Sequence, residues 1–180
     1  MKHAKSIAPL ALALLLAGCS QPPEEKRAFE VPGVLCGTKV SPALLSPLLP
    51  AGGEKLEAER SAPVGGGMMT CEVAVDGTTA LSLGWDWRKA GTSPGKVAND
   101  NPYLKLAEQK TPDGRVVYGE QSGAARVTCE PAAAHRRGAY ELFATLKVFE
   151  GRPDADAVKN LLVAYAKELE VSSEECVRKK

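Results

Sequence analysis

The sequence predicts an α+β domain with a mainly antiparallel sheet made of two similar β units. A short N-terminal helix and an amphipathic C-terminal helix are expected to pack on one face of that sheet. Three observations predict this fold: long segments in which apolar and polar residues alternate, an apolar stripe at helical spacing near the C-terminus, and a repeated Thr-Cys-Glu tripeptide. Hydrophobic residues make up 44% of the 180 residues and charged residues 25%, as is typical of a folded domain.

A short helix is expected near the start of the domain. Ser41 suits the N-cap position, and Pro42 suits the first helical position, where no N–H donor is needed. Pro47 and Pro50 limit the helix, because proline in a helix interior removes a hydrogen bond and clashes with the preceding turn.

Three strands are expected in the first half of the chain, over residues 55–61, 68–75 and 79–88. Asp76-Gly77, between the second and third, is a hairpin signal. The third strand alternates strictly, with one apolar face and one polar face. The apolar face carries Leu81, Leu83, Trp85 and Trp87, and the other carries Ser82, Gly84, Asp86 and Arg88. This alternation predicts one face in the core and one in water.

The second half of the chain repeats the β pattern and ends in a helix. Residues 89–109 are rich in Gly, Pro and Asn and predict a loop with one helical turn around 103–107. Alternation then predicts strands at 115–119, 124–130 and 140–149, with a turn around 135–138. Arg152-Pro153-Asp154 opens the C-terminal helix. Its apolar stripe consists of Val158, Leu161, Leu162, Tyr165 and Leu169.

The Thr-Cys-Glu tripeptide at residues 70–72 recurs at residues 128–130. Each copy is followed by a turn and then by a long alternating segment. This repeat is the basis for expecting two similar β units.

The first 19 residues indicate export and lipid attachment. Lys2, His3 and Lys5 form a positive start, and residues 7–16 form an apolar run that is shorter than the ~20 residues of a membrane-spanning helix. The Leu-Ala-Gly-Cys sequence that ends at Cys19 resembles the bacterial lipobox, in which the cysteine thiolate accepts a diacylglyceryl group. The alternative is an ordinary secretory signal with an accidental cysteine.

The expected organisation is a lipoprotein signal peptide at 1–18, a lipidated tether at 19–32 and one extracytoplasmic domain at 33–180. Acyl chains such as palmitate on Cys19 would hold the protein on the outer face of the cell membrane, since two or three chains anchor durably where one does not. The membrane is therefore one expected partner. The formal net charge of +1 includes Lys2 and Lys5 of the leader, so a nearly neutral mature chain predicts no nucleic-acid partner.

Four cysteines remain when Cys19 is set aside. An even number in an exported chain predicts a disulfide framework, which allows three connectivities. We favour Cys36–Cys71 and Cys129–Cys176, each closing a loop that contributes roughly 4 kcal/mol in the chain-entropy model.

One family resemblance rests on the lipobox, the Val-Leu-Cys-Gly sequence at residues 34–37, the Leu-Leu-Pro sequence at 48–50 and the strand around Cys71. Together these features resemble small lipoproteins of unknown function from Streptomyces-like actinobacteria. The resemblance implies a single functional residue, the acyl acceptor Cys19.

Sequence motifs for catalysis, cofactors or metals are lacking. There is no Gly-x-Ser-x-Gly sequence and no phosphate-binding loop, and no pair of cysteines is spaced as Cys-x-x-Cys. His135, the one histidine outside the leader, lies in a predicted turn, which favours an exposed residue over a general base. The Asn-Asp-Asn sequence at 99–101 does not fit a calcium loop and favours a turn. We therefore expect no cofactor, no metal site and no enzyme.

Trp85 and Trp87 are the most prominent candidates for binding. On one strand face they could form a platform for a sugar, a peptide or another apolar ligand. Burial in the core is favoured instead, because Leu81 and Leu83 share that face. The leading hypothesis is a binding module for an envelope protein or small-molecule ligand. The rivals are an envelope enzyme whose acids, such as Asp86 and Glu141, converge in the fold, and an inhibitor or sensor module.

The lipobox gives the first testable prediction. The native protein is expected to begin at Cys19 and to carry acyl chains on that thiol. Mass spectrometry of material purified from membranes checks both features. An unmodified residue 19, or a leader that is still attached, would contradict the prediction.

Overall fold

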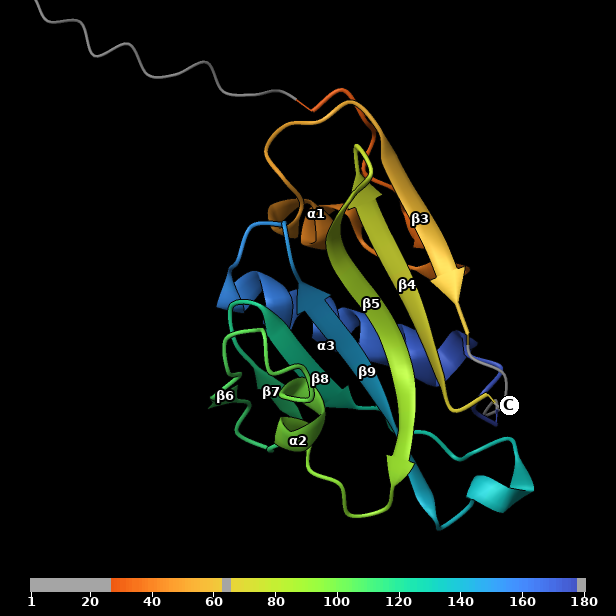
Figure 1. The fold of residues 1–180 in the computed structure, drawn as a ribbon. Helices are drawn as coiled ribbons and strands as arrows, with labels where there is room; N and C mark the ends of the chain where they lie inside the picture. The colour runs from red at the N-terminus through yellow and green to blue at the C-terminus, as the bar shows by residue number, and fades with distance from the viewer. Residues whose placement is uncertain (1–26, 63–65, 178–180) are drawn as a thin grey trace, which may run out of the picture.

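The main element of the fold is a seven-stranded antiparallel sheet with the order β3-β4-β5-β9-β8-β7-β6. The computed structural model describes residues 27–62 and 66–177. Helix α3 crosses one face of the sheet, and the short α2 lies on the opposite face (Figure 1). The sheet strands are β3 (Leu56–Ser61), β4 (Met68–Val75), β5 (Thr78–Lys89), β6 (Gln109–Lys110), β7 (Val116–Tyr118), β8 (Ser122–Arg126) and β9 (Tyr140–Val148). The remaining elements are β1 (Val34–Leu35), β2 (Thr38–Lys39), α1 (Pro42–Leu45), η1 (Ser46–Leu48), α2 (Pro94–Ala98), η2 (Ala134–Arg136) and α3 (Ala155–Ser172).

The sheet is built from two meanders that lie side by side. Strands β3, β4 and β5 form the first meander, and β6 to β9 form the second. The two are joined where β5 pairs with β9 over nine residue pairs. With α1 and α3, this arrangement confirms the predicted α+β fold. The two copies of the Thr-Cys-Glu repeat do not occupy equivalent positions in the two meanders, because one copy lies inside β4 and the other lies beyond the end of β8.

The turn between β4 and β5 is the hairpin that the sequence predicts. Asp76 and Gly77 both have positive φ angles, 50° and 79°, which match the right-handed twist of the flanking strands. The Asp76 carboxylate also accepts hydrogen bonds from the backbone N–H groups of Glu54 and Lys55, at 2.8 to 3.1 Å. The turn therefore fixes the start of β3 as well.

The main core lies between α3 and the sheet. The five predicted stripe residues of α3 are all buried, and they face the apolar sides of β5, β8 and β9. The Asp154 carboxylate caps the helix by accepting a hydrogen bond from Ala157 N at 2.7 Å. Burial raises the pKa of Tyr165, in the middle of the stripe, to about 12.

Helix α2 was not expected, and the helical turn predicted at 103–107 does not form. The signal for α2 is Ser93-Pro94, in which Ser93 Oγ accepts a hydrogen bond from Lys96 N at 3.2 Å. Tyr103 is instead 93% exposed in an irregular loop. Helix α2 buries a second, smaller cluster on the sheet face that was predicted to meet water: Val97, Ala98, Ala107, Ala124 and Phe143.

The packed chain starts earlier than predicted. Arg27 donates hydrogen bonds to Pro50 O, to Ser46 Oγ, to Ser46 O and to Leu49 O, at 2.6 to 2.8 Å. Phe29 and Val31 pack against the main core. Residues 27–32 therefore belong to the folded part, which corrects the tether boundary at 32, and residues 19–26 lie outside the described residues.

Both expected disulfides are present. Cys36–Cys71 joins the β1–β2 turn to β4, and Cys129–Cys176 joins the segment after β8 to the segment after α3. The second is accompanied by an antiparallel bridge between Pro131 and Cys176. Two disulfides fit an extracytoplasmic protein, because they persist in oxidising compartments. None of the helices in the described part of the chain has the length and apolarity needed to cross a bilayer.

Close packing of β4 on β5 gives a stability prediction. A Cβ atom added at Gly84 would lie 2.1 Å from the backbone oxygen of Met69, so Gly84→Ala forces the two strands apart. We expect a loss of about 1–3 kcal/mol in the free energy of unfolding, measured by urea denaturation. Ser82→Ala, on the same face of β5, is the control and is expected to change stability by less than about 1 kcal/mol. An equal effect of the two variants would contradict the prediction.

Candidate functional site

Trp85 and Trp87 belong to the core and form no open platform. Their exposed fractions are 7% and 6%, and both are part of the main cluster under α3. The indole N–H of Trp87 donates to the Glu175 carboxylate at 2.8 Å. The Arg136 guanidinium lies 5.1 Å from the centre of the Trp87 ring and pairs with Glu175 and the backbone oxygen of Gly66. These contacts occupy the polar edge and one face of Trp87.

A hollow of about 250 Å³ does lie beside Trp85, between β2, β4 and the end of α3. Its lining is mostly polar and includes Arg60, Ser172 and Glu174. An apolar groove at this place would have supported the sequence-based binding hypothesis. The structure therefore places the two tryptophans where the core interpretation expects them.

Asp86 lies on the opposite sheet face, within a network of charged side chains. Its carboxylate is 2.5 Å from the Arg88 guanidinium, which also pairs with Asp100 at 3.0 Å. Lys147 contacts Asp100 at 2.8 Å and closes the network. Burial raises the pKa of Asp86 above its usual value, and the attraction of Arg88 opposes this shift in part.

Glu141, the second acid of the enzyme hypothesis, is on the same face, because it pairs in register with Arg88 across β5 and β9. Its carboxylate lies 3.5 Å from Arg126 and accepts a hydrogen bond from Gly91 N at 3.1 Å. Asp86 and Glu141 therefore share a face, as the rival enzyme hypothesis requires. Each acid, however, is paired with an arginine, so the two do not form an open pair of carboxylates.

A groove lies between α3 and the turn that joins β6 to β7. We call it the α3 groove; its volume is about 450 Å³, within the range of small-molecule sites. Its floor is apolar and is formed by Val116, Ala125 and Ala166, and Val163 at its side is 45% exposed. The Pro112-Asp113 turn forms the opposite wall.

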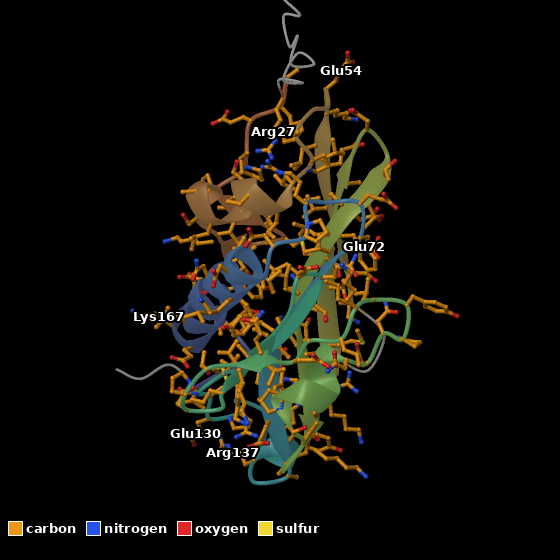
Figure 2. All side chains as sticks on the ribbon, turned by 90° about the vertical axis from the view of Figure 1, so that its left-hand side faces the viewer. Arg27, Glu54, Glu72, Glu130, Arg137 and Lys167 are labelled. Carbon is orange, nitrogen blue, oxygen red and sulfur yellow. A yellow bond between two sulfur atoms is a disulfide. The ribbon has the colours of Figure 1, made fainter. Side chains whose placement is uncertain are left out.

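The rim of the α3 groove is charged but largely self-paired. Arg115 contacts Glu170 at 3.3 Å, and Glu170 also accepts a hydrogen bond from Thr128 N at 2.9 Å. Asp113 accepts from Thr111 Oγ1 at 2.6 Å and from Arg115 N at 3.1 Å; these two bonds lower its pKa. Lys167, on the outer side of α3 (Figure 2), pairs with none of the described acidic side chains.

Sequence reasoning missed this groove, because α3 forms one wall and is distant in the chain from residues 111–126, which form the rest of the lining. Val163 is the one local signal, since it is an apolar residue of α3 outside the buried stripe. A single exposed valine is too common on protein surfaces to predict a site.

His135 and the Asn-Asp-Asn sequence at 99–101 are the remaining sequence candidates within the described residues. His135 is exposed in η2. Asn99 hydrogen bonds to Ala107 N and Ala107 O, at 2.7 and 3.1 Å, which holds the loop after α2. Over residues 27–62 and 66–177, no three His, Cys, Asp or Glu side chains lie together as a metal site would require. Cys19 lies outside the described residues.

Comparison of the chain with protein-family models, with curated proteins and with solved structures found no significant match. The site is therefore interpreted from its own geometry.

Asp86 and Asp113 predict opposite pH dependences of stability. A carboxyl whose pKa is raised by folding contributes stability at low pH, and this contribution is lost as the pH rises through the folded-state pKa. A carboxyl whose pKa is lowered contributes stability above its unfolded pKa, and this is lost as the pH falls. Asn mimics the protonated form of each.

The measurement is the Tm of the parent protein minus that of each variant between about pH 3 and pH 7. The difference is expected to fall with rising pH for Asp86→Asn and to rise for Asp113→Asn. Slopes of the same sign for the two variants would contradict the opposite pKa shifts of Asp86 and Asp113.

Proposed function

We propose that this protein is a lipid-anchored extracytoplasmic domain that binds a ligand or partner and is not an enzyme. The Leu-Ala-Gly-Cys sequence that ends at Cys19 supports the anchor, and the two disulfides support a location outside the cytoplasm. The α3 groove is the observation that carries the binding function.

The position of Arg27 fits a domain that is held close to its membrane. Residues 20–26 alone separate Cys19 from Arg27, and an extended chain advances about 3.3–3.6 Å per residue. A lipid on Cys19 would thus keep the Arg27 end of the domain within about 30 Å of the bilayer. The hydrogen bonds of Arg27 would connect this tether to Ser46 of η1 and to Pro50 just after it.

The chemistry of the α3 groove favours a ligand with an apolar body and an anionic group. A ligand that covers the apolar floor would be stabilised by about 25 cal/mol per Å² of apolar surface removed from water. At the rim, Arg115 and Asp113 are engaged within the protein, whereas Lys167 has no described acidic partner. An anionic group beside Lys167 would complete the charge balance.

An envelope enzyme is the second candidate, and the buried Asp86 favours it, since a raised pKa is a common property of general acids. The short contact between Asp86 and Arg88, and the pairing of Glu141 with Arg126, argue for a structural role instead. The binding function is therefore the proposal that we test.

Val163 provides the test of the α3 groove. Anilinonaphthalenesulfonate, an anionic fluorophore with an apolar body, is the probe. Val163→Glu places a negative charge at the side of the groove and is expected to weaken probe binding by about tenfold, equivalent to about 1.4 kcal/mol. The measurement is a fluorescence titration at fixed protein concentration.

Val171→Glu is the matched control, because Val171 is also an exposed valine of α3, at 64%, but does not line the groove. It is expected to bind the probe like the parent protein. If both variants bind equally, or if the parent protein does not bind, the α3 groove is not a site for amphipathic anions.

A further inference from the structure

A third hollow lies where the end of β5 meets α2. Its volume is about 410 Å³, and its lining includes Arg88 and Lys89 from β5, Lys96 from α2 and Asp100 just after α2. We call it the basic hollow. It is on the sheet face opposite α3, so it is separate from the α3 groove.

The charges of the basic hollow do not balance. Arg88 and Lys147 are the two cations of the ion-paired network, and Asp86 and Asp100 are its two carboxylates, so the network is neutral as a whole. Lys89 and Lys96 form no ion pair with a described residue. Two positive charges are therefore left uncompensated at one hollow of a chain whose total charge is close to zero.

The other polar groups of the lining are engaged within the protein. The Thr92 hydroxyl donates to Lys89 O at 2.7 Å, and the Asn99 side chain is held by Ala107. The Nε–H of Arg88, by contrast, is buried and has no hydrogen-bond partner among the described residues. The Nε atom itself is closed to solvent, but the Arg88 side chain is 37% exposed, so an incoming acceptor oxygen would meet the exposed part of this guanidinium.

The basic hollow is far from the point where the N-terminal chain enters. Strand β5 starts near α1 and ends, at Lys89, at the opposite end of the molecule (Figure 1). Figure 2 shows Arg27 at one end and Arg137, a neighbour of the β9 start, at the other. A tether at Arg27 would therefore turn the basic hollow away from the protein's own membrane.

We infer that the basic hollow is an anion site that receives a phosphate-bearing group, with Lys89 and Lys96 as its charged donors and Arg88 as its hydrogen-bond donor. Lysines and arginine are the side chains that bind phosphate oxygens most strongly. The source favoured by the position of the hollow is a soluble or wall-borne phosphate and not a lipid headgroup. Only this choice of source rests on the proposed anchor, and the site itself does not.

The test is isothermal titration calorimetry of the purified protein with tripolyphosphate at low salt. We expect saturable binding that weakens as salt is added, because the attraction is electrostatic. The double variant Lys89→Gln/Lys96→Gln is expected to lose about tenfold or more in affinity. Lys39→Gln/Lys110→Gln, which removes two exposed lysines elsewhere, is the charge-matched control and is expected to bind like the parent.

Three results would overturn the inference. They are no binding of tripolyphosphate at low salt, equal losses in the two double variants, and binding to phosphatidylglycerol vesicles without binding to tripolyphosphate. The last result would assign the lysines to a lipid surface. None of them bears on the α3 groove, because Val163 and its fluorescent probe report on a different face.

Discussion

The pairing of β5 with β9 is the constraint on which the rest of the structure depends. It joins the two meanders, and its register decides which side chains face α3 and which face α2. Trp85 opposite Ala144 lies on the α3 side, whereas Asp86 opposite Phe143 lies on the other. A slip by one residue would exchange these two faces and would bring the charged network into the main core. This register therefore sets the two faces of the sheet on which the α3 groove and the basic hollow lie.

Much of this fold could be predicted from the sequence, because its strands and its long helix have strong periodicity. The alternation in β5 and the stripe on α3 are local patterns, and they identify the main core correctly. The sequence allows three connectivities of the four cysteines, and the favoured one is present. The same reasoning did not predict α2, because five residues are too few to show a helical period. Its Ser-Pro start was a usable signal that matches the one at Ser41.

The candidate sites could not be predicted in the same way, because each is made by tertiary contacts. Asp86 looked like a solvent-facing residue in the alternation of β5, yet α2 and its loop cover that face and bury it. Arg27 looked like part of a polar tether, yet its guanidinium has four acceptors: the backbone oxygens of Ser46, Leu49 and Pro50 and the Ser46 hydroxyl. In both cases the deciding partner belongs to another element of the chain. Local composition carries no information about such a partner.

The arginine contacts at the N-terminal end have a mechanical consequence. Tension applied through the N-terminal chain would reach Arg27 first and then the carbonyl groups of Ser46 and Leu49. Arg152, just before α3, donates to the same two carbonyl groups at 3.3 and 3.0 Å. The load would thus be shared with the long helix and would bypass the edge strand β3, which pairs with β4 alone. A pull on an edge strand breaks its hydrogen bonds one at a time. Tension at Arg27 would instead load several hydrogen bonds in shear at once.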